Sequence, residues 1–431
     1  MNRRQFLTRS AAGTAGLWLA APYIARSQSK LVPSERLNIA FVGTAGQAGF
    51  SISNLKDHNI VALCDVDETK LNAAAQTFPG AKTYRDFRRL VDQKRIDAIV
   101  VATPDHTHAV ASMAALQSGR HLYCEKPLTR TVSEARIVTE TARKLKRVTQ
   151  IGTQIHAGGN YRRVVELVRS GAVGDISEVH VWVNSSYGGK DKPATGLEVP
   201  KNLDWDLWLG PVPERDYSPD FAPFAWRNWW AFGGGSLADF GCHFMDLPFW
   251  ALDLHHPVSI EAEGPPVSGE STPPWLIVRY EFPERIHLGT RWPAVKLTWY
   301  HGGKHPEMLT PEQYEKWKGG VMFVGSKGQL ISDYGRHALW PEKDFEGFVK
   351  PKPFLQESLG HHKEWVEAIK FGGSTTCRFD YSGPLTETAL LGNVAFRVGK
   401  KLQWDFDAMR ATNCPEADAF LQHHYRKGWQ I

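Results

Sequence analysis

The N-terminal part of the chain alternates between short, continuously apolar runs and longer stretches with helical periodicity. Runs at residues 37–42, 60–64 and 96–102 have strand length, and a helical pattern through Leu116 leads to a fourth run that ends before Glu125. Strands buried on both faces of a sheet are apolar throughout, and their alternation with helices is typical of parallel sheets. The pattern therefore predicts a doubly wound parallel α/β sheet.

The pattern changes after residues 152–154. Runs at 178–183, 276–282 and 295–300 alternate apolar and polar residues, as strands do when one face packs on a core and the other is wet. They predict a second, α+β domain with a largely antiparallel sheet that can form a wall for a ligand. The expected domains are residues 28–150 and 151–431.

The N-terminus carries a separate pattern. Asn2-Arg-Arg-Gln-Phe-Leu7 precedes an apolar, alanine-rich stretch over residues 11–25, which is shorter than a membrane-spanning helix needs. Small residues at Ala25 and Ser27 suit a signal peptidase. We therefore expect residues 1–27 to be a cleaved twin-arginine export signal, giving a periplasmic or exported protein with no stable membrane anchor. An uncleaved anchor is the alternative.

Charge and cysteine content narrow the classes of partner and site. Removing the four arginines of the signal from the 51 basic residues leaves 47 against 46 acidic ones. A near-neutral mature chain gives no indication of a nucleic-acid or polyanion partner. The five cysteines show no metal or redox spacing, and buried free thiols are expected, as at Cys64 and Cys124.

A glycine-rich turn, residues 43–49, follows the first apolar run, and Asp65 ends the next one. This order of strand, turn, helix, strand and acid is that of a dinucleotide site. There the turn admits a pyrophosphate to the helix N-terminus and the acid binds the ribose. Ala45 and Ala48 replace the second and third glycines of the usual pattern. A solvated carboxylate is the alternative interpretation of Asp65.

The fourth apolar run ends in Glu125-Lys126-Pro127. Ligands of open parallel sheets bind outside the carboxyl ends of the strands. The charged pair is therefore expected where a bound dinucleotide presents its nicotinamide. Together with the glycine turn, it predicts a Rossmann-type N-terminal domain.

These motifs, with Thr103-Pro104, His108 and residues 380–394, resemble the Gfo/Idh/MocA family of glucose-fructose oxidoreductase, inositol dehydrogenase and rhizopine-catabolism proteins. The resemblance covers nearly all of the mature chain and implies an NAD(P)-dependent sugar oxidoreductase. We expect NAD, because Asp65 would repel the 2′-phosphate of NADP, which is the alternative. The expected cofactor-binding residues are Gly43, Thr44, Ala45, Gly46, Gln47, Ala48, Asp65, Thr103, Pro104, Asp105, His108, Glu125, Lys126 and Gln154.

A second motif spans residues 233–246. Gly235 and Ser236 read as a helix start, after which Asp239, His243 and Asp246 have the spacing of one face of one helix. Three alternatives remain: a capping role for Asp239, a core position for His243, and metal ligation by all three. No further His or Cys cluster joins them, so no metal is predicted.

The resemblance implies catalytic roles for Lys126, Asp239 and His243. Histidine titrates at roughly pH 6.5 when unperturbed, so neutral His243 suits a general base. Asp239 is expected to orient His243, and Lys126 to donate a hydrogen bond to the developing alkoxide. The resemblance also implies a cis bond before Pro127.

Aromatic segments of the second half are candidates for a substrate site. We expect Arg227, Trp229 and Tyr300 to contact a sugar. Packing at the domain interface is the alternative, since tryptophan buries a large area in any case. His361 and His362 are expected to be surface or interface residues.

Three functions remain. The first is an exported oxidoreductase that acts on a hydroxyl of a sugar or glycoside with a tightly bound, recycled cofactor. The second is a glycosidase that oxidises, eliminates and re-reduces with NAD held in place. The third, a sugar-binding protein with a vestigial cofactor site, is disfavoured by intact Lys126, Asp239 and His243. The expected partner is a small sugar or glycoside, and a homo-oligomer is expected.

Overall fold

The computed structural model describes residues 35–287 and 289–431. Residues 37–431 form one compact unit. The predicted export signal at residues 1–27 lies outside the described residues. Within the described part of the chain, no helix combines the length and apolarity that crossing a bilayer requires.

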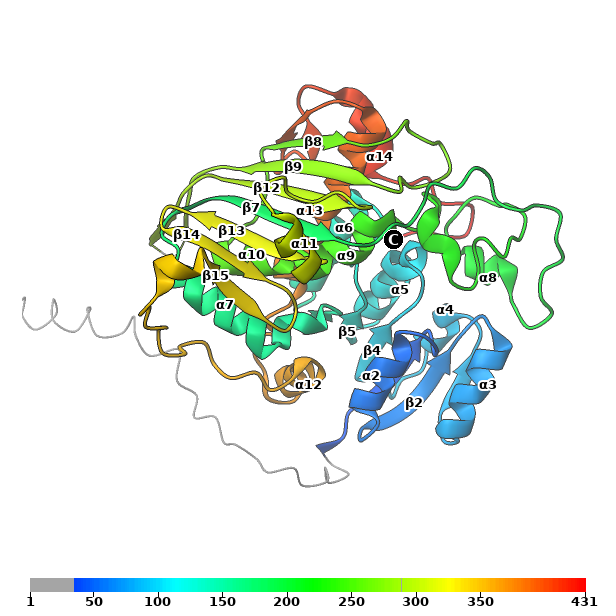
Figure 1. Cartoon of the computed structure of the whole chain (residues 1–431). Helices are drawn as coiled ribbons and strands as arrows, with labels where there is room; N and C mark the ends of the chain where they lie inside the picture. Colours follow the sequence, from blue (N-terminus) through cyan, green and yellow to red (C-terminus); the bar gives the residue numbers. More distant parts are fainter. Residues whose placement is uncertain (1–34, 288) are drawn as a thin grey trace, which may run out of the picture. The chain divides into compact units, whose positions relative to one another are not determined.

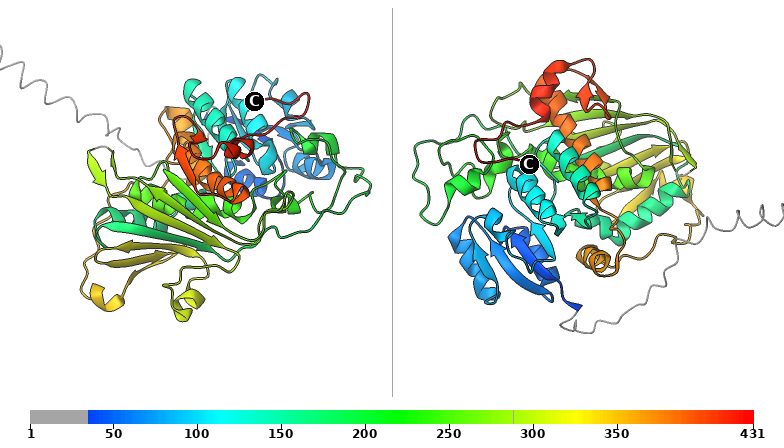
Figure 2. Two further views of the ribbon diagram at one scale, coloured as in Figure 1. Left: turned by 90° about the horizontal axis from the view of Figure 1, so that it is seen from above. Right: turned by 180° about the vertical axis from the view of Figure 1, so that it is seen from behind.

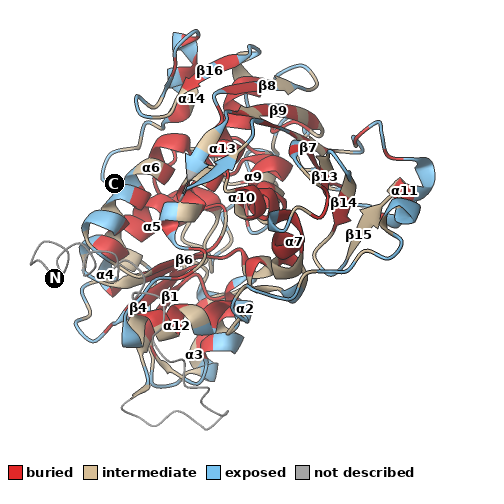
Figure 3. Ribbon diagram, turned by 90° about the vertical axis from the view of Figure 1, so that its left-hand side faces the viewer, coloured by how far each residue is buried: buried red, intermediate tan, exposed pale blue. Residues whose placement is uncertain are grey.

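The N-terminal half of this unit contains a six-stranded parallel sheet with the strand order β3-β2-β1-β4-β5-β6. Its strands are β1 (Asn38–Val42), β2 (Asn59–Cys64), β3 (Lys82–Tyr84), β4 (Ala98–Val101), β5 (His121–Cys124) and β6 (Thr149–Ile151). Every residue of β4 is buried, and so are four of the five in β1, as the continuous apolar runs require (Figure 3). The predicted doubly wound sheet is confirmed.

Helices cover both faces of this sheet. One face packs on α5 (Asp105–Gln117) and α6 (Val132–Lys144), and the other packs on α2 (Ala48–Leu55) and α3 (Glu68–Thr77). The late helix α12 (His361–Phe371) also packs on this second face, through Trp365. Figure 1 shows α12 beside the dark blue helix α2. The C-terminal part of the sequence therefore completes the core of the N-terminal sheet.

His361 and His362 belong to this returning helix and are 6% and 3% exposed. His361 Nε2 lies 2.7 Å from the Ile151 carbonyl, and His362 Nε2 lies 2.9 Å from the Ser51 hydroxyl. The His362 ring also stacks on Tyr123. Of the two expectations, surface or interface, the surface position is wrong: both histidines are buried where α12 packs on the N-terminal part of the fold.

The second half contains a nine-stranded sheet with the order β15-β14-β13-β7-β12-β9-β8-β16-β17. Its strands are β7 (Ile176–Val183), β8 (Ser259–Glu263), β9 (Leu276–Phe282), β12 (Val295–His301), β13 (Gly320–Gly325), β14 (Gly328–Ser332), β15 (His337–Trp340), β16 (Leu402–Asp405) and β17 (Arg410–Ala411). All its pairs are antiparallel except β12 with β7. The largely antiparallel sheet is confirmed. A separate two-stranded ribbon joins β10 (Arg285–His287) to β11 (Thr290–Trp292).

Alternation along these strands separates two faces. One face packs on α7 (Gly159–Arg169), α9 (Gly235–Phe244), α10 (Asp246–Leu252) and α13 (Phe379–Val398). Helix α13 also packs on α6 and so ties the two sheets together (Figure 2). The opposite face, expected to be wet, carries a smaller cluster around Trp182 and Trp317, next to α11 (Pro311–Lys316). The remaining helices are α4 (Phe87–Leu90), α8 (Trp205–Leu209) and α14 (Asp418–Leu421).

Candidate active site

The glycine turn lies where β1 ends and α2 begins. Gly43 has φ +91°, and a Cβ there would stand 2.4 Å from the Ala102 carbonyl oxygen, so only glycine fits. The backbone N–H groups of Ala45, Gly46 and Gln47 make no hydrogen bond within the described chain. Free N–H groups before a helix suit the pyrophosphate of a dinucleotide. The turn therefore fits the cofactor that its sequence predicts.

Asp65 lies at the carboxyl end of β2, against this turn. Its Oδ2 accepts hydrogen bonds from the Thr44 N–H at 3.0 Å and the Thr44 hydroxyl at 2.9 Å. Its Oδ1 accepts from the Asp67 N–H. The carboxylate thus stands next to the turn, where a ribose would lie, and its contact with the ribose stays a prediction.

Glu125 and Lys126 follow β5, and the Lys126–Pro127 peptide bond is cis, as expected. Glu125 is 4% exposed and packs so closely on Gly152 that a Cβ there would meet its carboxylate at 2.3 Å. Gln154 donates to Glu125 Oε1 at 3.2 Å, while Oε2 has no partner among the described residues. Burial raises the pKa of Glu125 to about 8.

Lys126 reaches from the parallel sheet to α9. Its Nζ donates to Asp239 Oδ1 at 2.5 Å and to the Asp239 carbonyl at 2.8 Å. Arg227 donates from Nε to the same Oδ1 at 3.1 Å. Burial alone would raise the pKa of Asp239, but the charges of Lys126 and Arg227 outweigh it and lower the pKa to about 2. This carboxylate is therefore ionised at neutral pH.

His243 lies one helical turn beyond Asp239. Burial, reinforced by the charge of Lys126, lowers its pKa to about 3, so the ring is neutral at working pH. Nδ1 is enclosed and lacks a partner among the described residues, which leaves Nε2 as the nitrogen accessible to a substrate. The expectation that Asp239 orients His243 is corrected: the Asp239 carboxylate is bonded to Lys126 and Arg227 instead.

The same cluster includes Asp105, the first residue of α5. Asp105 is 4% exposed, and burial raises its pKa to about 7 against the opposing charge of Arg227. His108, one turn later, is also buried, with Nδ1 2.8 Å from the Pro127 carbonyl and Nε2 2.8 Å from the Thr103 carbonyl. Both ring nitrogens are thus directed at backbone carbonyls. His108 thus connects the loops that carry Thr103 and Pro127, and its predicted contact with a cofactor stays a prediction.

Two family descriptions match successive parts of the chain. The description "Oxidoreductase family, NAD-binding Rossmann fold" matches residues 37–153, and "Oxidoreductase family, C-terminal alpha/beta domain" matches residues 160–289. Together they span more than half of the sequence. The chain belongs to the Gfo/Idh/MocA oxidoreductase family. Residues 37–153 thus match the NAD-binding Rossmann fold of an oxidoreductase family.

Curated members of the Gfo/Idh/MocA family match parts of the chain. Inositol 2-dehydrogenase of Rubrobacter xylanophilus is 34% identical over 146 residues, which are 33% of this chain and 42% of that protein. A glycosyl hydrolase family 109 protein of Shewanella sp. strain ANA-3 is 26% identical over 204 residues, which are 41% of this chain and 44% of that protein. The chain therefore spans less than half the length of these relatives.

Solved structures share the fold at low identity. The WlbA dehydrogenase of Bordetella pertussis, in complex with NADH and UDP-GlcNAcA, has a TM-score of 0.61 at 17% identity and covers 86% of this chain and all of its own. Aldose-aldose oxidoreductase of Caulobacter crescentus, complexed with glycerol, has a TM-score of 0.57 at 18% identity with the same coverage. These likenesses show the fold.

The structure separates Asp246 from the other two residues of the motif. Helix α9 ends at Phe244 and α10 begins at Asp246. Asp246 accepts hydrogen bonds from the Tyr381 hydroxyl at 2.7 Å, and its Oδ2 lies 2.9 Å from His156 Nδ1. A metal site built from Asp239, His243 and Asp246 is therefore not supported by this geometry.

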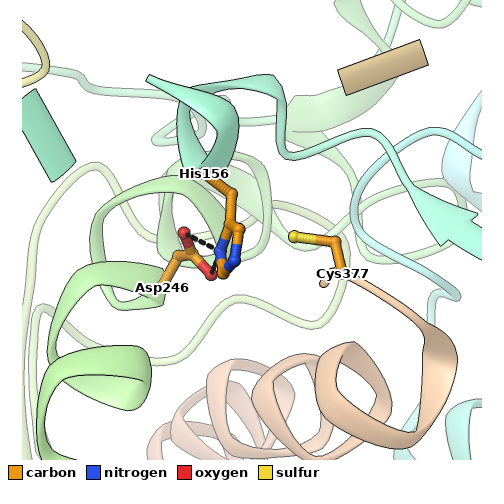
Figure 4. Close-up of side chains that lie close together, drawn as sticks. All are labelled: His156, Asp246 and Cys377. Carbon is orange, nitrogen blue, oxygen red and sulfur yellow. Dashed lines mark hydrogen bonds and ion pairs between the residues drawn. The ribbon is translucent and has the colours of Figure 1, made fainter. Parts of the chain in front are cut away.

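Asp246 instead belongs to a buried group with His156 and Cys377, which come from three distant segments (Figure 4). Their nitrogen, oxygen and sulfur atoms lie within 4.8 Å of one another, and such donors suit Zn²⁺. Asp246 is already bonded to His156 and Tyr381, and Cys377 contacts the Thr153 hydroxyl at 3.2 Å. The group therefore works as a hydrogen-bonded support for the start of α10.

Of the three expected substrate residues, the structure brings only Arg227 to the site. Trp229 is 1% exposed in an aromatic cluster with Phe221, and its Nε1 donates to the Asp220 carbonyl. Tyr300 lies in the small cluster beside α11, on the sheet face opposite α9. The packing interpretation fits Trp229, and sugar contacts by Trp229 and Tyr300 are corrected.

Two tyrosines that no sequence motif predicts lie near the charge cluster of Lys126, Asp239 and Arg227. Burial, with the charge of Asp239, raises the pKa of Tyr187, whose ring stacks on Phe240 of α9. The Tyr334 ring lies edge-on to His243 at 6.2 Å between centroids. Both come from isolated positions outside the helices and strands. Only folding brings them to α9.

Proposed function

We propose that this chain is an exported, NAD-dependent oxidoreductase that oxidises a hydroxyl of a sugar or glycoside. The observation that carries the proposal is the ion-paired cluster of Lys126, Asp239 and Arg227 beside neutral His243. The cluster stands at the carboxyl edge of an NAD-binding sheet. The names of the inositol dehydrogenase and of the aldose-aldose oxidoreductase support a polyol or sugar as the substrate class.

The residues divide the reaction between them. NAD, when bound, supplies the acceptor for the hydride that leaves the carbinol carbon. His243 Nε2 takes the hydroxyl proton, and the C–O bond becomes a carbonyl. Lys126 Nζ, now bonded to Asp239, donates to the substrate oxygen as negative charge develops on it. Asp239 holds Lys126 in position, Arg227 donates to the same carboxylate, and the low pKa of His243 keeps its ring neutral before it accepts the proton.

NAD fits better than NADP. The Asp65 carboxylate lies against the turn and would repel a 2′-phosphate. Export through the twin-arginine route carries folded proteins, so the cofactor would travel with the chain. The cofactor would then have to be recycled at its own site, by a second carbonyl substrate or by re-reduction of the same one. We expect a periplasmic or exported homo-oligomer, which size-exclusion chromatography of the exported protein would check.

The experiment is mass spectrometry of the purified, exported protein after denaturation. It should release NAD in near-stoichiometric amount, and a glycoside panel should then yield an oxidised or cleaved product. A protein that carries no nicotinamide, or only NADP, would contradict the cofactor assignment. Steady accumulation of NADH in solution with excess free NAD would contradict recycling.

A glycosidase is the second candidate function, because the Shewanella relative is named a glycosyl hydrolase. It would use the same oxidation at Lys126 and His243 and then eliminate the aglycone. A deuterated glycoside with no acceptor added separates the two. Free aglycone with deuterium washed out beside the oxidised carbon identifies the glycosidase, and a keto-sugar that forms only with an acceptor identifies the oxidoreductase.

A further inference from the structure

A cavity of about 310 Å³ lies away from the catalytic cluster. Its walls come from the residues before α6, the loop before α9, helix α13 and the segment after α14. Neither Lys126, Asp239 nor His243 lines it. The residues that matter for its chemistry are Arg130, Trp230, Asn393, Arg397, Gln422 and His423.

Two arginines line this cavity without a carboxylate partner. Arg130 is 7% exposed; its Nη1 donates to the Trp230 carbonyl at 2.9 Å, and its Nε has no partner among the described residues. The Arg397 guanidinium lies over the rings of Trp230 and Phe420, at 5.0 and 4.2 Å from their centroids. In the described chain, neither arginine forms an ion pair.

The acid nearest to Arg130 in sequence, Glu134, offsets part of the charge of Arg130, whereas no acid offsets that of Arg397 among the described residues. Glu134 Oε2 accepts the N–H groups of Arg130 and Thr131 and so caps α6, while Oε1 accepts the Tyr425 hydroxyl at 2.6 Å. Burial lowers the pKa of Arg130 and of Arg397 to about 10, so both remain charged at neutral pH. A largely buried charge without a counter-charge is costly, so the excess positive charge at Arg397 suits an anion supplied from outside the chain.

A neutral group adds a second requirement. Asn393 is 6% exposed, and its Nδ2 donates to the Gly234 carbonyl, which leaves Oδ1 enclosed with no donor among the described residues. Burial, with the charges of Arg130 and Arg397, lowers the pKa of His423 to about 2, so its ring is neutral. The cavity thus offers cationic donors together with an acceptor that needs a hydroxyl.

We propose that this cavity binds a small hydroxylated oxyanion, with Arg130 and Arg397 binding its charged oxygens and Asn393 Oδ1 accepting a hydroxyl. Two sources share that chemistry: a sugar acid, through its carboxylate and ring hydroxyls, and hydrogen phosphate. Arginine is suited to both because its planar fork matches carboxylate and phosphate oxygens. The site is independent of the proposed oxidation, since none of the catalytic residues takes part.

The test is isothermal titration of the full-length exported protein with glucuronate, inorganic phosphate, sulfate and glucose at constant ionic strength. Saturable binding of glucuronate or phosphate is expected, and the tighter of the two identifies the source. Arg397→Gln should raise the Kd by at least about tenfold, since it removes a charged hydrogen-bonding partner. Arg291→Gln, at an exposed arginine on β11, is the matched control and should leave the Kd unchanged.

Gln422→Glu is a second variant that tests the same site if Arg397→Gln folds poorly. This exposed side chain lines the cavity, so an added negative charge should weaken binding several-fold without loss of thermal stability. Binding of glucose that depends on Arg397, or sulfate binding as tight as phosphate, would overturn the assigned anion-and-hydroxyl chemistry. Absence of binding by all three anions, or binding unchanged in both cavity variants, would overturn the site.

Discussion

On the two sides of the charge cluster around Lys126 and Asp239, the pKa of a buried carboxyl is shifted in opposite directions. On the parallel-sheet side, burial raises the pKa of Glu125 to about 8 and that of Asp105 to about 7. On the α9 side, Lys126 and Arg227 overcome burial and lower the pKa of Asp239 to about 2. Environment, not residue type, therefore decides which carboxyl carries charge at neutral pH. The ionised Asp239 holds Lys126, and Glu125 is a packed, largely neutral neighbour.

The largest effect is expected where the two sides meet. Lys126→Ala removes the only side-chain cation contributed to this cluster by the parallel sheet, among the described residues. Turnover of the glycoside substrate should fall by about 10²–10³-fold, because a preorganised donor to the developing charge is lost. His243→Ala should cost about 10²–10⁴-fold through loss of the base. Both variants should retain NAD by mass spectrometry, and near-full activity in either would refute its assigned role. Lys327→Ala, in the β13–β14 turn, is the control.

A matched pair of amide substitutions sharpens the comparison. Asp239→Asn leaves Lys126 and Arg227 buried without a carboxylate and should lower the free energy of unfolding by about 3–5 kcal/mol at pH 7. Glu125→Gln replaces a mostly protonated acid with its neutral analogue. Because it removes the cost of keeping that acid protonated, it should raise the free energy of unfolding at pH 7 by up to about 3 kcal/mol. Urea unfolding followed by tryptophan fluorescence measures both. Equal losses of unfolding free energy in Asp239→Asn and Glu125→Gln would contradict the difference in charge between the two carboxyls.

The pH dependence of stability has opposite signs on the two sides. Because the pKa of Glu125 rises from 4.5 to about 8, its contribution is present in full below pH 4.5 and is lost as pH rises toward 8. Because the pKa of Asp239 falls from 3.8 to about 2, its contribution is present above pH 3.8 and is lost as pH falls toward 2. Between pH 5 and 8, the free energy of unfolding should fall by up to about 1.4 kcal/mol per pH unit because of Glu125. Glu125→Gln should remove this part of the slope. An unchanged slope would show that Glu125 is ionised in the folded protein.

The smallest effect on turnover is expected for a substitution outside the charge cluster. Tyr300→Phe removes a hydroxyl that lies 3.1 Å from His180 Nδ1 on the far face of the nine-stranded sheet. The kcat and KM of the Tyr300→Phe variant should stay within about twofold of the parent values. Substitutions away from a functional site have small effects, and Tyr300 contacts no residue of the charge cluster. A large rise in KM would show that Tyr300 contacts the substrate after all.

The sequence predicts the fold and the sheet edge well because those features are local. Continuous apolar runs require strands buried on both faces, and Gly43 is needed where no Cβ fits. The break between α9 and α10 was also visible in principle. Pro248 has no N–H to donate to the Phe244 carbonyl, so Asp246 could have been assigned to a second helix.

The charge network could not be predicted, because it depends on distant segments meeting. The family resemblance and the helical spacing predict that Asp239 orients His243, yet its carboxylate bonds to Lys126, 113 positions away in sequence. A tryptophan can pack in a core or bind a sugar, and the sequence around Trp229 does not indicate which of the two it does. The return of α12 to the parallel sheet likewise rests on tertiary contacts of Trp365, which no periodicity reveals.

One measurement tests the central claim most directly: the absorbance of reduced nicotinamide in a single turnover of the purified holoprotein with a glycoside panel, beside Lys126→Ala. The account predicts that at least one sugar or glycoside reduces the bound cofactor rapidly, and that Lys126→Ala slows this step by about 10²–10³-fold with NAD content unchanged. Failure of every sugar to reduce bound NAD, or an equal rate in Lys126→Ala, would contradict it.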